Sequence, residues 1–241
     1  MRKLAIIGVL VVCALPWGAQ AQATTFRMSS PYIEPGKTKA EWQGFYSHDE
    51  DDSKDMAWKQ NFILGYGVNE YWKTQFRTAY EKGGQGDDPD ITASAFENTF
   101  ALTKRGEHYF DVAIKADYQH FYSGETADNI STKLIVGRNT QDFLHIFNFR
   151  ITHDIGSDTH NSGGIAWSTR YKYSPEIQPA LEIYNDFGSI DKENVFRNQN
   201  RSVGPAVSGR ISGIDYQAGV LFGLTDSTPD ETFKLSIGYQ F

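Results

Sequence analysis

Charged side chains of both signs recur at alternate positions along several segments, and this spacing could build a charge-selective surface. After Glu107, Asp111, Lys115 and Asp117 share one parity and the other parity is apolar. Alternate residues of a β-strand point to one face. The strongest candidates for a charged inner face are Arg77, Asp111, Lys115, Asp117, Arg170, Glu182, Asp186 and Arg210. Further candidates are Glu41, Glu97, Asp215, Lys59, Lys73, Lys133, Arg150, Lys172 and Lys234. Such a face could select solutes by charge, or close itself through ion pairs.

Residues suited to nucleophilic catalysis do not form a coherent set. A serine hydrolase needs a serine beside a histidine that a third polar group orients. His145 and Asn98 interrupt apolar parities, but their segments are not neighbours in a simple meander. His153 and Asp154, like Asp158 and His160 nearby, fall at a polar strand end, where histidines are usually solvated. We therefore predict no catalytic residues and no enzyme, with a hydrolase as the minor alternative.

Two acidic stretches could bind a cation through carboxylate oxygens. Residues 49–55 carry five carboxylates, and residues 83–90 partly match a glycine-rich calcium-binding repeat. Only one copy of that repeat is present, and Asp90 stands where it needs an apolar residue. Solvated loop charge is the simpler interpretation, so we predict no metal site and no cofactor.

Composition excludes several classes of protein. The formal net charge is −7, which does not favour nucleic acid as a partner, because nucleic-acid binding needs a basic face. The single cysteine, Cys13, lies in an N-terminal apolar run of 4–15. Arg2 and Lys3 precede this run and Ala19–Ala21 offers a small-residue cleavage site, so residues 1–21 are predicted to be an export signal. The exported chain would then have no disulfide and no thiolate metal ligand.

The segments that carry these charged residues are predicted to be β-strands. Apolar and polar residues alternate over Trp72–Glu81, 110–119, 165–173, 215–224 and 232–241. Weaker alternation covers 38–47, 56–68, 91–103, 129–138, 143–154, 178–188 and 202–212. This gives about twelve strands of roughly ten residues, the length that a tilted membrane strand needs. Short and long connections alternate along the chain, as in transmembrane barrels with short periplasmic turns and long outer loops.

The predicted fold is therefore all-β: a transmembrane, antiparallel, up-and-down barrel over 37–241. Residues 22–36 contain no good strand. They would form an N-terminal segment that lies in the periplasm or folds into the lumen.

The C-terminal stretch Phe233–Phe241 resembles the last strand of outer-membrane barrels of Gram-negative bacteria, because its apolar residues alternate and it ends in phenylalanine. The stretches 65–72 and 221–225 are similar to uncharacterised envelope proteins of this kind. The resemblance implies a porin-like barrel in the outer membrane, with Tyr239 and Phe241 as an assembly signal. It also implies that the partners are outer-membrane lipid, lipopolysaccharide and the barrel-assembly machinery.

Barrels of about eight strands have a lumen that side chains fill, and barrels of about sixteen enclose a water channel. A barrel of intermediate size leaves two functions open. The first is a narrow channel for passive passage of small polar solutes. The alternative is a closed structural or surface-binding barrel that acts through its acidic loops.

Overall fold

The computed structural model describes residues 26–51, 54–82, 88–123, 126–156, 159–190 and 199–241. Within them the chain forms twelve strands. In chain order they are β1 (Thr38–His48), β2 (Trp58–Gly67), β3 (Trp72–Lys82), β4 (Asp90–Ala101), β5 (Asp111–Phe121), β6 (Asn129–Asn139), β7 (Phe143–Asp154), β8 (Asn161–Tyr171), β9 (Gln178–Ser189), β10 (Asn200–Ile211), β11 (Ile214–Gly223) and β12 (Glu231–Gln240).

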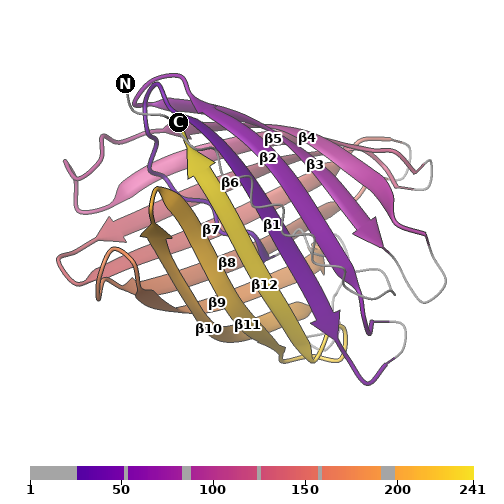
Figure 1. The fold of residues 1–241 in the computed structure, drawn as a ribbon. Helices are drawn as coiled ribbons and strands as arrows, with labels where there is room; N and C mark the ends of the chain where they lie inside the picture. The colour runs from indigo at the N-terminus through magenta and orange to yellow at the C-terminus, as the bar shows by residue number, and fades with distance from the viewer. Residues whose placement is uncertain (1–25, 52–53, 83–87, 124–125, 157–158, 191–198) are drawn as a thin grey trace, which may run out of the picture.

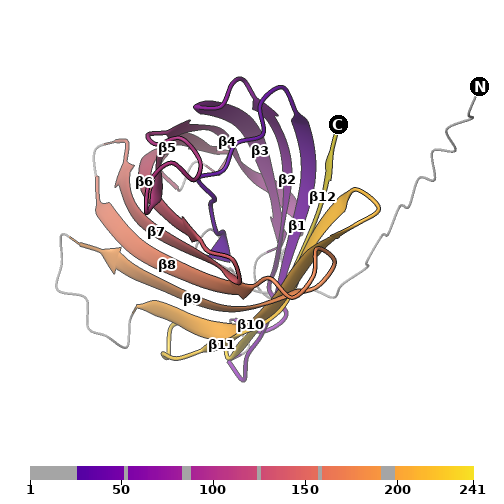
Figure 2. The ribbon, with the colours of Figure 1, turned by 90° about the vertical axis from the view of Figure 1, so that its left-hand side faces the viewer.

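The strands form one closed antiparallel barrel in which each strand pairs with its neighbours in the chain (Figures 1 and 2). The first and last strands close the ring, with Lys39 opposite Gln240 and His48 opposite Glu231. Closure leaves no unpaired sheet edge, which a membrane requires of a β-structure. The predicted all-β up-and-down barrel is confirmed, including the strand count.

Connections of two to six residues join β2 to β3, β6 to β7, β8 to β9 and β10 to β11, all at one end of the barrel, as the sequence predicts. The connection from β4 to β5 lies at the same end, but it spans 102–110, so the predicted tight turn and the strict alternation of short and long connections are wrong at this point. The C-terminus lies at this same end (Figure 1), where the backbone of Phe241 exchanges two hydrogen bonds of 2.9 Å with Thr38. We call it the turn end, and the opposite end the loop end.

The two faces of the wall differ in polarity. Large apolar side chains remain exposed on the outside, among them Phe62, Phe76, Phe96, Phe147, Phe222 and Phe233. Soluble monomers rarely expose a continuous apolar belt, so this exterior is suited to lipid. The inner face is instead rich in buried polar groups such as Asn61, Glu97 and Glu182.

No helix among the described residues is long and apolar enough to cross a membrane.

Candidate functional site: the charged lumen

The described residues that precede β1, from Phe26 onward, enter the barrel (Figure 2, indigo). The ring of Phe26 packs against Phe45 of β1 and edge-on against Tyr184 of β9, with centroid distances of 6.4 and 5.6 Å. The backbone N–H of Ser29 donates to Asn148 Oδ1 of β7 at 2.7 Å, and Asn148 Nδ2 donates to the Ser29 carbonyl at 2.9 Å. We call residues 26–36 the lumenal segment. The sequence leaves periplasmic and lumenal positions open for 22–36, and residues 22–25 lie outside the described part of the chain.

Two glycines let the lumenal segment approach the wall closely. A Cβ at Gly67, the last residue of β2, would lie 2.1 Å from the carbonyl oxygen of Glu34. A Cβ at Gly137 of β6 would lie 2.8 Å from Pro31 Cγ. Real Cβ atoms do not approach other atoms so closely, so a side chain at either position would displace the segment.

A buried carboxylate anchors the segment to the wall. Glu97 of β4 is 1% exposed and accepts hydrogen bonds from Arg27 Nη1 at 2.7 Å, Arg77 Nε at 2.9 Å and Lys115 Nζ at 2.6 Å. Arg27 Nη2 at 3.3 Å and Gln75 Nε2 at 2.7 Å donate to the same carboxylate. A single negative charge therefore holds three cations, and Arg27 comes from the lumenal segment. We call these residues the Glu97 cluster.

A second buried carboxylate organises the opposite wall. Glu182 of β9 is fully buried and accepts hydrogen bonds from Lys234 Nζ at 2.7 Å and Gln217 Nε2 at 2.6 Å. The hydroxyl of Tyr184 donates to the same carboxylate at 3.0 Å. This cluster ties β9 to β11 and β12 beneath the Phe26 ring.

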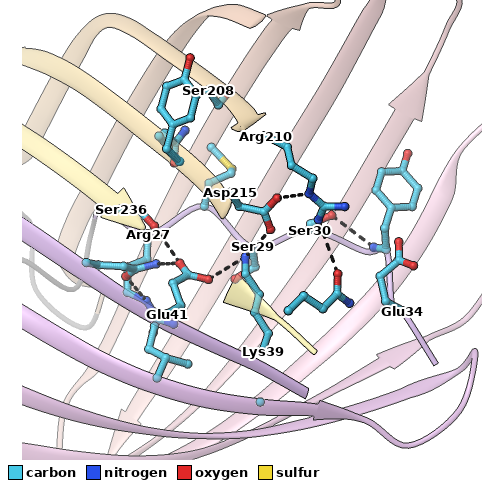
Figure 3. A pocket seen from close by; sticks show the side chains of 18 of the residues that line it. Arg27, Ser29, Ser30, Glu34, Lys39, Glu41, Ser208, Arg210, Asp215 and Ser236 are labelled. Atoms are coloured by element: carbon cyan, nitrogen blue, oxygen red, sulfur yellow. Dashed lines mark hydrogen bonds and ion pairs between the residues drawn. The ribbon is translucent and has the colours of Figure 1, made fainter. Parts of the chain in front are cut away.

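Between these clusters lies a cavity of about 660 Å³. Its lining includes residues at the turn end, such as Lys37, Arg105 and Pro175, and it reaches Phe26 and Phe45 toward the loop end. Figure 3 shows a chain of alternating charges on its wall: Arg210 Nε contacts Asp215 at 2.6 Å, Lys39 Nζ contacts Asp215 at 3.4 Å, and Lys39 contacts Glu41 at 3.0 Å. The wall of the cavity is therefore mostly polar and charged, with Phe26 and Phe45 among its few aromatic residues.

The eight inner-face candidates from the sequence fall into two groups. Lys115, Arg170 and Arg210 line the cavity. The other five do not line it. Arg77 belongs to the Glu97 cluster, and Glu182 belongs to the second cluster. Asp186 accepts a hydrogen bond from Arg150 Nη2 at 2.6 Å, and Asp111 accepts one from the Gly106 N–H at 2.7 Å. Asp117 is partly buried and pairs with Glu97 in the β4–β5 register.

The strand pattern alone does not find Arg27. This residue lies in a segment without alternation, and its partner Glu97 is 70 positions away. The available signal is weak: a basic residue beside an aromatic one just before the first strand. Strand parity does place Lys73, Asp215 and Lys234 on the inner face, and all three line the cavity.

The catalytic and metal candidates stay apart in the structure. His145 Nδ1 contacts Thr169 Oγ1 at 2.8 Å, and Asn98 accepts from Trp72 Nε1 at 3.0 Å, so each has a different local partner. His153 contacts Asn161. No group of three or more His, Cys, Asp or Glu side chains in the described residues could hold a metal ion. Asp52, Asp158 and residues 83–87 lie outside the described residues.

Histidine–carboxylate pairs at the loop end have structural partners. Asp128 accepts hydrogen bonds from the Tyr118 hydroxyl at 2.5 Å, from His120 Nδ1 at 2.9 Å and from the Phe121 N–H at 3.0 Å. The Tyr118 hydrogen bond, followed by that of His120, lowers the pKa of Asp128 to about 2. These contacts tie a long loop to β5.

The proposed assembly residues face outward at the turn end. The rings of Tyr239 and Phe241 stack at 6.1 Å and are 53% and 61% exposed. Tyr239 pairs with Ala40 of β1 and Ile214 of β11, so it lies at the seam where the barrel closes. Their role in recognition stays a prediction.

No protein-family model matches the chain, and no curated protein matches it. Solved structures share its fold. The KdgM porin, also solved in complex with disordered oligogalacturonate, has a TM-score of 0.60 at 8% identity, covering 84% of this chain and 99% of that one. The COG4313 outer membrane channel from Pseudomonas putida F1 has a TM-score of 0.65 at 12% identity, covering 87% and 97%. The chain is therefore a β-barrel with the fold of outer-membrane channels, in agreement with the expected outer-membrane location.

Proposed function

We propose that the protein is a narrow outer-membrane channel for passive passage of small polar solutes. The observation that supports it best is the polar cavity of about 660 Å³, which lies inside the barrel and is lined by charged side chains. This volume falls within the usual range for small-molecule sites. The fold shared with porins and channels is compatible with transport and offers no support for an enzyme.

The lumenal segment would set the width of the channel. Phe26 forms a buried cluster with Phe45, Tyr184 and Leu221, which come from three different strands. Solutes would have to pass beside this cluster or displace it. We therefore expect small conductance from the full chain.

Planar-bilayer recording of the purified barrel tests the proposal. We expect discrete, repeatable channels, and a larger unit conductance for Phe26→Ala, because the substitution removes the ring that crosses the lumen. Phe222→Ala is the matched control, since Phe222 is 44% exposed on the outer face. Its conductance should equal that of the unmodified protein.

The second candidate is a closed structural or surface-binding barrel. The Phe26 cluster favours it, because Phe26 packs inside the lumen against buried aromatic side chains of two strands that are not neighbours, β1 and β9. Silence of both the full chain and Phe26→Ala, in preparations that show folded barrel on unheated gels, would support this candidate and contradict the channel.

A further inference from the structure

The cavity has the opposite charge to the protein as a whole. The chain carries a formal net charge of −7. Nine basic residues line the cavity: Arg27, Lys37, Lys39, Lys73, Arg105, Lys115, Arg170, Arg210 and Lys234. Only three acidic residues of the described chain join them: Glu34, Glu41 and Asp215. The lining thus carries more positive than negative charge inside an acidic protein.

The three carboxylates of the cavity are already engaged. Glu34 contacts Arg105 Nη1 at 3.3 Å, and Asp215 contacts Arg210 and Lys39. Glu41 accepts from Lys39, and from Ser236 Oγ at 3.0 Å. Arg27, Lys115 and Lys234 are held by the two buried glutamates described above. These pairs neutralise most of the cations on the wall.

Three lining cations have no such partner among the described residues: Lys37, which is exposed at the turn end, and Lys73 and Arg170, which face the cavity from opposite parts of the ring. Lys73 is near the start of β3, and Arg170 is near the end of β8, so both lie toward the turn end. Neither makes a side-chain hydrogen bond or ion pair with the described chain, and Arg170 Nε is buried without an acceptor. Both side chains are half-buried. The buried Nε–H of Arg170 is unfavourable without an acceptor, and an anion in the cavity would supply one.

The chemistry of the remaining lining indicates what kind of anion would fit. The guanidinium of Arg170 presents a planar fork that matches a carboxylate. Neutral hydrogen-bonding groups also line the cavity, including the side chains of Gln75, Gln178, Ser208 and Gln217. These side chains can form hydrogen bonds with hydroxyl groups, so they suit an anion whose remaining part is hydrophilic better than one with an apolar chain.

We propose that the cavity binds small hydrophilic organic acids, with Arg170 and Lys73 as the groups that hold the carboxylates. The site deepens the proposed channel function and rests on it, because it would make the passage prefer anions. Positive rings select anions in other pores in the same way.

Binding is tested without conductance by calorimetric titration of the folded, detergent-solubilised barrel with citrate, and with glucose as an uncharged probe. We expect citrate to bind and glucose to bind far more weakly. Arg170→Gln and Lys73→Gln should each weaken citrate binding roughly tenfold, because each removes charge-assisted hydrogen bonds. Neither substitution leaves a carboxylate of the described chain unpaired, so both variants should fold. Lys104→Gln and Arg138→Gln are matched controls outside the cavity and should bind citrate normally.

Reversal potentials across a KCl gradient supply the second measurement. The unmodified channel should favour chloride, and the double variant Lys73→Gln/Arg170→Gln should move toward potassium. Channels without citrate binding and without anion preference would overturn the site while the channel function stands. Citrate binding that depends on both cations in a barrel without conductance would support the site and contradict the channel. Citrate binding that is unchanged in both variants would overturn the assignment of these residues.

Discussion

Replacement of Glu97 by glutamine is the sharpest test of how the lumen is held together. The substitution keeps the size of the side chain but removes the carboxylate charge that three cations share: the buried Arg77 and Lys115 and the partly buried Arg27. Breaking a buried ion pair from one side costs about 3–5 kcal/mol, because the other charge stays buried without compensation. Since three cations lose their partner at once, we expect Glu97→Gln to fall at the upper end of this range.

The assay is equilibrium unfolding in urea of the barrel in detergent or lipid, followed by tryptophan fluorescence. Glu107→Gln is the matched control. Its carboxylate lies 3.3 Å from Lys104 in an exposed turn, with 55% of the side chain accessible. Exposed pairs of this kind contribute about 0–1 kcal/mol.

A double-mutant cycle measures the energetic coupling between the lumenal segment and the barrel wall. Adding Arg27→Met to Glu97→Gln removes one of the stranded cations, so the double variant should be more stable than the sum of the single effects predicts. Equal unfolding free energies for Glu97→Gln and Glu107→Gln would refute the reasoning. Strict additivity of the Arg27 and Glu97 effects would show that the segment is not coupled to the cluster.

Three further outcomes are expected. Gly67→Ala should raise single-channel conductance without loss of folded barrel, because its Cβ would displace the lumenal segment; unchanged conductance would contradict this. Deleting Phe241 should lower the yield of folded, heat-modifiable barrel while export continues, and normal yield would count against an assembly role. The pKa of Asp128, held at about 2 by Tyr118 and His120, lies below its ordinary value of 3.8. The stabilisation of its loop should therefore persist above pH 4 and disappear as the pH falls through 2; NMR titration of the carboxyl group checks this, and a midpoint near 4 would exclude it.

Strand alternation predicts the wall of this barrel well because its physical cause is local. Each residue that alternates toward lipid must be apolar, so the sequence itself records the two faces. The short turns and the terminal strand add independent local signals. Even the faint pattern over 129–138 corresponds to a real strand, β6.

The contents of the lumen are less predictable because they depend on contacts across the ring. Arg77 and Arg170 carry the same charge, and each lies at a polar, inward position of its own strand. Arg77 is nevertheless held by Glu97, Asn61 and Gln119, whereas Arg170 faces the cavity. The difference depends on which strands lie opposite and on where Arg27 enters. Residues 26–36 show no regular alternation of apolar and polar residues, so the sequence pattern could not predict that they lie inside the barrel.

Thr38 marks the boundary between the lumenal segment and the strands of the barrel wall. Every strand pairing of the barrel begins at or after this residue, and the lumenal segment lies before it, held mainly by side chains and a few turn contacts. The wall of the barrel and the segment that fills part of its lumen are therefore formed by different parts of the chain. Withdrawal of residues 26–36 would break no strand pairing, so the hydrogen-bonded ladder of the barrel does not depend on this segment. The Glu97 cluster is the point where the two are coupled, because Arg27 shares its carboxylate with two cations of the wall.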